Sequence, residues 1–430
     1  MRPISILAAL SKVAEHLILE QIQEFIDERK YINEYQYGFR RGLSTTSLLV
    51  DLTDLIRETI DGGESGVLVA LDLSKAFDCV DYSRLIQKLR SNYAFDNTAC
   101  NLILSYLSGR SQYVSLNGKT SNKLNIYSGV PQGSILGPLL FVLYVNDIGN
   151  CLHNSGCRPF LYADDIHLFF NGKSSSLLEF NINNTLSAVS RWLCNNNLVI
   201  NVTKTKAMGY GPLCRLNSID IRVNGLIIEF VDRIKCLGVI VDSKLDFSAH
   251  IDALHPRVMN ILRKLYSTEF YMPLFVKRNH AYSMLISLIS YGIEVVSGTT
   301  HEHFNKIEKL FNMVVRYVYN LRRSDHVSAY AAEFLGVPFS VFVKKRVISF
   351  LYKSVTLDLP GVLPDRLAFS RSTRNTQLIL RYSTCLYERS FIIRSSRLWN
   401  QLPVELRHFS FSRSVFQRKF EDFAVNYMLD

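Results

Sequence analysis

The pattern of hydrophobic and polar residues predicts a β-hairpin with acids at its tip. Residues 160–170 read FLYADDIHLFF, so two apolar runs flank a pair of aspartates. Aromatic and β-branched residues favour strands, and a short polar break between two such runs is typical of a hairpin turn. An isolated Asp-Asp pair is more often an ordinary turn. Here the apolar flanks are expected to be buried, which leaves Asp164 and Asp165 in need of a cation such as Mg²⁺.

A second buried strand is expected to end at a third acid. The continuous apolar run GVLVAL at residues 66–71 is typical of a central strand, and Asp72 follows it directly. Beyond Asp72 the pattern turns polar with helix-start residues, which indicates a strand-to-helix junction. Asp78 and Asp81 lie past this junction, and we interpret them as capping or surface acids.

A loop rich in glycine and proline separates these two acidic segments. Residues 128–138 read SGVPQGSILGP, and the apolar run Leu139–Val145 follows. This pattern predicts a loop that leads into a buried helix. Glycines permit close approach of the backbone to a ligand, and a helix N-terminus favours phosphate groups. The sequence therefore indicates a nucleotide-binding loop.

Three further segments have clear periodicity. Asn224-Gly225 lies between short apolar runs and predicts a tight hairpin. The stretch 281–296 is apolar but contains Glu294 and several serines, so it predicts a packed helix rather than a membrane span. An apolar stripe with helical spacing predicts a core helix, and its members are Leu177, Leu178, Leu186, Val189 and Leu193.

Charge is distributed unevenly along the 430 residues. Residues 1–250 carry 24 basic and 24 acidic side chains, whereas residues 251–430 carry 25 basic and 14 acidic ones. The whole net charge of +11 therefore comes from the C-terminal part. Such a surface suits a nucleic-acid backbone or an acidic partner, and a merely soluble basic surface is an equally good interpretation of charge alone.

The cysteines argue against a disulfide or zinc framework. All 8 are scattered without a C-x-x-C pair, and no signal peptide precedes them. We therefore expect reduced cysteines and an intracellular protein.

Three segments in this order resemble the signature motifs of reverse transcriptases. They are ALDLSKAFD at residues 70–78, GVPQGS at 129–134 and YADD at 162–165. The chain is most similar to enzymes of non-LTR (LINE-type) retrotransposons, particularly the jockey-like group. Further segments resemble this family along nearly the whole chain: RPIS at 2–5, QYGFRRGLST at 36–45, NVTKTK at 201–206, KCLGV at 235–239 and RSSRLWNQLP at 394–403.

The resemblance implies an α+β right-hand polymerase. Fingers and palm would occupy residues 1–250, with an antiparallel palm sheet supported by helices. A helical thumb over residues 251–330 would lie on the nucleic-acid duplex, and residues 331–430 would form a small basic C-terminal region.

The resemblance also implies two-metal nucleotidyl transfer onto a DNA primer on an RNA template. Asp72, Asp164 and Asp165 would hold two Mg²⁺ ions, for which Mn²⁺ is a possible substitute, and the Leu73 carbonyl would be an extra ligand. Lys204 matches the lysine that protonates the leaving pyrophosphate, although Lys206 stands close enough to compete for this role.

Four further residues would bind the incoming deoxynucleoside triphosphate. Phe77 would exclude a 2′-hydroxyl, with a buried helix residue as the alternative. Gln132 and Gly133 would contact the nucleotide or its template base, and a simple loop hydrogen bond is the alternative for Gln132. Arg40 would bind the triphosphate, although a surface salt bridge is nearly as good an interpretation.

Two other functions compete with this interpretation. An RNA-dependent RNA polymerase shares the palm chemistry, but Phe77 and the YADD motif disfavour it. A catalytically idle remnant that only binds nucleic acid is the alternative from another class. Because a fingers-like motif follows Met1 directly, we expect no endonuclease domain. We also expect no ribonuclease H domain, because the sequence after the thumb lacks the set of spaced acids that would mark one. By resemblance, the protein would act in the nucleus, with no membrane contact and unknown protein partners.

Overall fold

The computed structural model describes residue 5 and residues 7–153, 155–212, 219–267, 272–357, 366–368 and 377–427. Its contacts divide the chain into two compact units. Unit 1 comprises residues 1–44 and 65–231, and unit 2 comprises residues 45–64 and 232–430. These bounds differ from the three segments expected from the sequence, because residues 45–64 pack with unit 2 and the division falls at 231 rather than 250.

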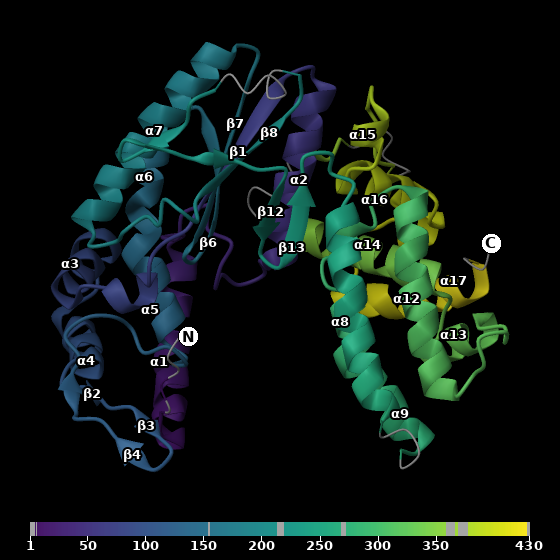
Figure 1. Ribbon diagram of the computed structural model, residues 1–430, viewed down its shortest axis with the longest axis horizontal. Coiled ribbons are helices and arrows are strands. Elements are labelled where there is room, and N and C mark those ends of the chain that lie inside the picture. The colour runs from purple at the N-terminus through teal and green to yellow at the C-terminus, as the bar shows by residue number, and fades with distance from the viewer. Residues whose placement is uncertain are drawn as a thin grey trace. The chain divides into compact units, whose positions relative to one another are not determined.

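Unit 1 is built on a five-stranded sheet with the order β11-β8-β1-β7-β6 (Figure 1). Every neighbouring pair is antiparallel except the short edge pair β11–β8, which is parallel. The strands are β1 (Ser65–Leu71), β6 (Cys157–Tyr162), β7 (Asp165–Gly172), β8 (Lys206–Tyr210) and β11 (Glu229–Phe230). The predicted hairpin and central strand are both confirmed.

One face of this sheet packs against helices of unit 1. Alternate residues of β1 and β7 belong to a single core, as the two-residue period of a strand requires. Residues 139–145 of α5 are all buried in this core, and α7 contributes one apolar side. The helices of the unit are α1 (Ala9–Glu28), η1 (Ala76–Cys79), α3 (Tyr82–Tyr93), α4 (Asn97–Leu107), α5 (Gly137–Val145), η2 (Asn146–Ile148), α6 (Gly149–Leu152) and α7 (Ser175–Asn195).

Two predicted elements of unit 1 are confirmed with one correction. Asn224-Gly225 joins β9 (Arg222–Val223) to β10 (Leu226–Ile227). The predicted apolar stripe lies on α7, and its members are buried except Leu177, which is 59% exposed. Its neighbour Leu178 in the same turn is 2% exposed and belongs to the core, and successive residues of a helix point about 100° apart, so Leu177 faces away from the core and its assignment to the core was wrong.

Unit 2 is mostly helical. Its described residues include a hairpin that pairs β12 (Arg233–Cys236) with β13 (Val239–Asp242). Helices α8 and α12 lie side by side (Figure 1). The helices are α2 (Thr45–Asp61), α8 (Ser248–Tyr266), α9 (Leu274–His280), η5 (Ala281–Ile286), α10 (Ser287–Ile289), α11 (Ile293–Val296), α12 (His301–Tyr319), α13 (Ser328–Leu335), α14 (Phe339–Thr356), α15 (Cys385–Glu388), α16 (Phe391–Asn400), η7 (Val404–Leu406) and α17 (Arg413–Tyr427).

The apolar stretch 281–296 does not form the single helix predicted from its composition. A π-helical turn opens it, and Gly292 breaks it with a left-handed φ of 67° before α11 begins. Most of its apolar side chains are buried, so the prediction of a packed segment is confirmed. Among the described residues, no helix combines the length and apolar character needed to cross a membrane.

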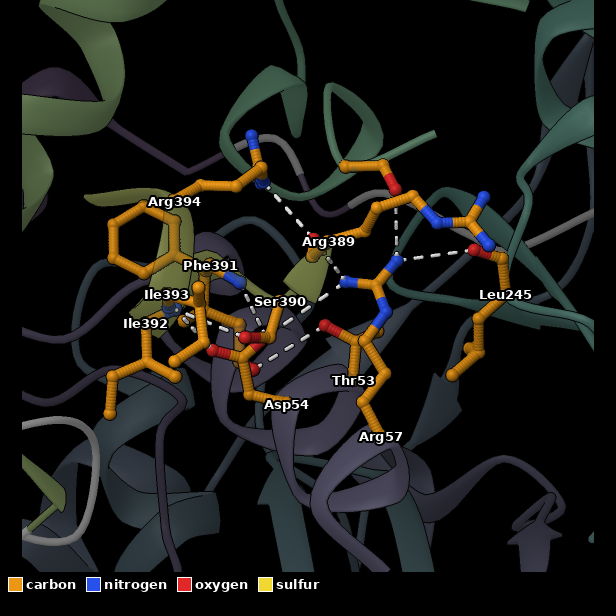
Figure 2. Close-up of polar contacts among 12 residues, drawn as sticks. Thr53, Asp54, Arg57, Leu245, Arg389, Ser390, Phe391, Ile392, Ile393 and Arg394 are labelled. Carbon is orange, nitrogen blue, oxygen red and sulfur yellow. Dashed lines mark hydrogen bonds and ion pairs between the residues drawn. The ribbon is translucent and has the colours of Figure 1, made fainter. Parts of the chain in front are cut away.

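Buried polar contacts attach α2 to the rest of unit 2 (Figure 2). The Asp54 carboxylate accepts hydrogen bonds from the N–H groups of Phe391 and Ile392 at 2.7 and 2.8 Å, and so caps α16. The fully buried Arg57 guanidinium donates to the carbonyls of Leu245, Gly298 and Arg389 at 3.0–3.2 Å. These contacts explain why a helix from the first sixty residues belongs to the unit formed by the C-terminal half.

Candidate active site

Two of the candidate acids lie at neighbouring strand ends. Leu71, the last residue of β1, pairs with Ile166 of β7. One step beyond this pair on each strand stand Asp72 and Asp165, so the antiparallel register brings these two residues next to each other. Asp164 occupies the turn between β6 and β7, where Tyr162 pairs with Asp165. The sheet therefore gathers all three acids at one end of its central strands.

The three acids do not form a closed metal site. Among the described residues, no group of three or more His, Cys, Asp or Glu side chains is arranged to hold a metal ion. The Asp72 side chain is 42% exposed, and Asp165 is also exposed. The arrangement is thus an open set of oxygen donors at a sheet end, which is the donor type that Mg²⁺ prefers.

Lys204 is the lysine that accompanies these acids. Its ammonium lies 3.9 Å from the Asp72 carboxylate, whereas Lys206 pairs with Glu229 at 2.6 Å. The backbone N–H of Asn201 donates to the Asp72 carbonyl at 2.7 Å, which holds the segment before Lys204 against the end of β1. Leu73 forms a bridge with Ile200. The geometry therefore supports the preference for Lys204 over Lys206.

Gln36 holds the turn that carries Asp164. Its side chain is buried, and its Oε1 atom accepts hydrogen bonds from the N–H groups of Gly38 at 2.8 Å and Ala163 at 3.1 Å. Ala163 has a left-handed φ of 54°, so the turn needs support from outside. A Cβ atom on Gly38 would lie 2.8 Å from the Ala163 nitrogen, which shows how closely the two segments approach.

The backbone around Gln36 is held as well. Tyr37 donates its N–H to the Leu161 carbonyl at 2.8 Å, and Leu161 donates to Tyr35 at 3.0 Å. The QYGF segment thus lies along β6 and against the turn. We did not predict a role for Gln36, although it stands in a segment that resembles the family.

The glycine-proline loop is attached to the segment after Asp72. The Phe77 ring is half-buried and stacks on Phe141 with centroids 4.3 Å apart. Gln132 donates its amide to Asp78 at 2.7 Å, so the loop hydrogen bond considered as the alternative is present. Asp78 is therefore bonded to the loop, while Asp81 caps α3 as predicted by accepting from the Arg84 N–H at 2.9 Å.

Two glycines allow this loop its path. Gly129 has a φ of 88°, and a Cβ atom there would lie 2.8 Å from the Asp78 Cα atom. Gly133, beside Gln132, has a φ of 101°. Residues with a side chain rarely adopt such backbone conformations, so the close approach of the loop to the Asp72–Asp78 segment depends on glycine.

The N-terminus of α5 is not open to phosphate, which corrects the expectation from the sequence. The buried Glu15 carboxylate accepts hydrogen bonds from the N–H groups of Ile135 and Leu136 at 2.7 and 3.2 Å. An acid already occupies the positive end of the helix. The sequence pattern that could have indicated a buried Glu15 is its spacing from Ile22 and Ile26, which places all three residues on the same face of α1.

Arg40 is half-buried and donates from its guanidinium to the Asn33 carbonyl at 3.2 Å. Burial lowers the pKa of Arg40, and the nearby Asp27 opposes this shift. The described contacts of Arg40 are therefore with the segment before the QYGF turn rather than with the three acids.

Residues 1–241 match the family model described as reverse transcriptase (RNA-dependent DNA polymerase). The chain belongs to this family. Within it, the chain is 30% identical over 330 residues to a probable RNA-directed DNA polymerase from transposon BS of Drosophila melanogaster, a match that covers 74% of the chain and 36% of the relative. It is 29% identical to the RNA-directed DNA polymerase from mobile element jockey of the same species, over 74% of the chain and 35% of the relative.

These matches confirm the resemblance to jockey-like non-LTR elements. The chain spans about a third of the length of these curated relatives. An apo telomerase structure from Candida tropicalis aligns with 81% of the chain and 55% of its own length, at 11% identity and a TM-score of 0.43. Family membership and the helix-backed sheet confirm the expected α+β right-hand polymerase fold.

Proposed function

We propose that this chain is the polymerase part of a non-LTR retrotransposon enzyme, which extends the 3′-hydroxyl of a DNA primer on an RNA template. The observation that carries the proposal is the position of Asp72, Asp164 and Asp165 at the ends of strands β1 and β7, within the region that matches the reverse transcriptase family. Relatives named RNA-directed DNA polymerases support the substrate class. Integration at a chromosomal target would place this activity in the nucleus.

The donor set fits divalent metal ions, which enzymes of this family typically use. Asp72, Asp164 and Asp165 offer carboxylate oxygens, and the Leu73 carbonyl adds a neutral one. Two Mg²⁺ ions bound there would lower the pKa of the primer hydroxyl and offset the charge of the triphosphate. The Lys204 ammonium lies 3.9 Å from the Asp72 carboxylate, so a cation and an anion of the protein are already close together at this site.

The protein's own contribution is to position the reactants and to move one proton. Lys204, which is 69% exposed and lies 3.9 Å from the Asp72 carboxylate, would protonate the leaving pyrophosphate. Phe77 presents its half-buried ring beside the sugar of the incoming nucleotide. Its stacking on Phe141 makes the ring a rigid wall against a 2′-hydroxyl.

Three other residues complete the proposed nucleotide site. Gln132 and Gly133 contact the base pair that forms, and the Gln132 amide exchanges its bond with Asp78 for one with the nucleotide. Arg40 provides a planar cation for the triphosphate, which requires it to leave its contact with Asn33.

Primer extension tests this function. The assay measures Mg²⁺-dependent incorporation of deoxynucleotides on an RNA template with a DNA primer. We expect synthesis by the parent and none by the Asp164→Asn, Asp165→Asn double variant. Asp220→Asn, an exposed acid of the same unit, is the control and should copy at the parent rate. A folded, RNA-binding parent without synthesis would overturn the proposal and favour a binding remnant.

The steric role of Phe77 gives a separate prediction. Phe77→Val should raise the kcat/KM for ribonucleotides relative to deoxynucleotides by roughly tenfold to 10²-fold, since a smaller side chain admits the 2′-hydroxyl. Phe180→Val on α7, where the ring is 62% exposed, is the matched control. No gain in ribonucleotide use by a folded Phe77→Val variant would refute this role.

A further inference from the structure

Residues 110–127 form two nested ladders between α4 and the glycine-proline loop, and we call them the 110–127 hairpin. The outer ladder pairs β2 (Ser111–Gln112) with β5 (Leu124–Asn125), and the inner one pairs β3 (Ser115–Leu116) with β4 (Lys119–Thr120). The Asn117-Gly118 turn closes the inner ladder with φ of 50° and 77°, as a type I′ turn requires. Figure 1 shows β2, β3 and β4 at the end of unit 1 beyond α4.

The hairpin has no core of its own. Every residue from 111 to 125 is exposed. Five large apolar side chains lie between 55% and 80% exposed, and they are Tyr113, Val114, Leu116, Leu124 and Tyr127. A two-stranded ribbon without a covered face is marginally stable in water. Such a cluster of uncovered side chains marks a binding surface.

The charge of the surrounding sequence indicates a polyanionic partner. No Asp or Glu stands between Asp96 and Asp147, although residues 1–250 carry equal numbers of acidic and basic side chains. Lys119 and Lys123 are exposed, and no described carboxylate forms an ion pair with either. A segment that carries cations and no acids attracts phosphates.

The aromatic residues distinguish a single strand from a duplex. Tyr113 and Tyr127 are 55% and 80% exposed, and Asn125 donates from its amide to the Tyr127 hydroxyl at 3.2 Å. Exposed aromatic rings next to lysines are typical of surfaces on which unpaired bases stack. In a duplex the bases are already stacked on each other, so the rings would gain little.

We propose that the 110–127 hairpin binds single-stranded nucleic acid, with phosphates on Lys119 and Lys123 and bases on Tyr113 and Tyr127. The hairpin leads directly into Ser128, whose hydroxyl donates to the Asp78 carbonyl at 3.1 Å, and so into the loop of the proposed nucleotide site. The bound strand is then the unpaired template near the site, and this last step rests on the proposed function.

Fluorescence anisotropy of a labelled oligo(U) RNA with the whole chain tests the inference, over 50 to 200 mM salt. For Lys119→Gln, Lys123→Gln we expect the slope of log K against log salt to become shallower by about 1.4, since each phosphate contact in a single strand contributes about 0.7. For Tyr113→Ser, Tyr127→Ser we expect affinity to fall about tenfold or more at an unchanged slope. Lys12→Gln, Lys173→Gln is the control with exposed lysines of the same unit and should match the parent.

The outcomes separate the alternatives. Losses with oligo(dT) as well as oligo(U) support a shared single-strand site, and losses with oligo(U) alone make it selective for RNA. Parent-like binding by both hairpin variants overturns the inference and leaves the hairpin as a protein-docking surface. Because binding is measured without synthesis, failure of primer extension alone bears only on the proposed function.

Discussion

Gln36 gives the sharpest test of how the acids are positioned. Gln36→Met keeps the side chain's length and removes the oxygen that accepts from Gly38 and Ala163. Two buried N–H groups then lose their partner, at about 1–3 kcal/mol each. The Gln36 Nε2 atom is itself buried without a partner, so its removal offsets about one such term. We expect the free energy of unfolding to fall by about 2 kcal/mol.

The catalytic effect should exceed the effect on stability. Asp164 follows Ala163 directly, and a displacement of about 1 Å in a catalytic group reduces the rate on the order of 10²-fold. Urea unfolding followed by circular dichroism measures the first effect. Primer extension well below the unfolding midpoint measures the second, as a fall in kcat with the KM for the template within about twofold of the parent.

The control is Gln21→Met, an exposed glutamine of α1. It should unfold and copy like the parent. A Gln36→Met variant with the parent's unfolding midpoint and the parent's kcat would refute the reasoning, because the turn would then hold its conformation without the amide.

Three further predictions concern stability. Gly129→Ala should destabilise unit 1 by about 2 kcal/mol or more in urea unfolding, because φ is positive and the new Cβ would meet the neighbouring backbone at 2.8 Å. The control Gly109→Ala, where φ is 69° but the space is open, should cost only about 1–2 kcal/mol, and equal losses for the two variants would contradict the close approach at Gly129. Arg57→Met should lower the free energy of unfolding by about 3–5 kcal/mol, because it leaves buried partners unpaired. The control Arg263→Met, at an exposed position, should change it almost not at all, and an equally small change at Arg57 would show that water replaces the guanidinium. Burial lowers the pKa of His250 to about 4, below its unfolded value near 6.5, so the contribution of neutral His250 to folding stability is complete above pH 6.5 and is lost as the pH falls toward 4. The parent's loss of stability between pH 7 and pH 5 should therefore shrink by about 2 kcal/mol in His250→Gln, and an unchanged pH profile would contradict this role of His250.

Local patterns were enough to place the acids. The apolar runs on either side of Asp164 and Asp165 form β6 and β7, and the run before Asp72 forms β1, since strand periodicity is a property of neighbouring residues. The same holds for the buried helix α5 after its loop. The roles of the site residues remain predictions, although the geometry supports Lys204 over Lys206.

Only the tertiary structure decided which distant segments support these elements. The bond from Ala163 to Gln36 spans 127 residues, and the bond from Phe391 to Asp54 spans 337. Glu15 at the start of α5 is a third case. The free energy of such contacts depends on which buried polar groups face each other once the core has packed, and no periodicity along the chain records that. The sequence by itself therefore determined the motif elements and the family, and the packing of remote segments determined what holds those elements in place.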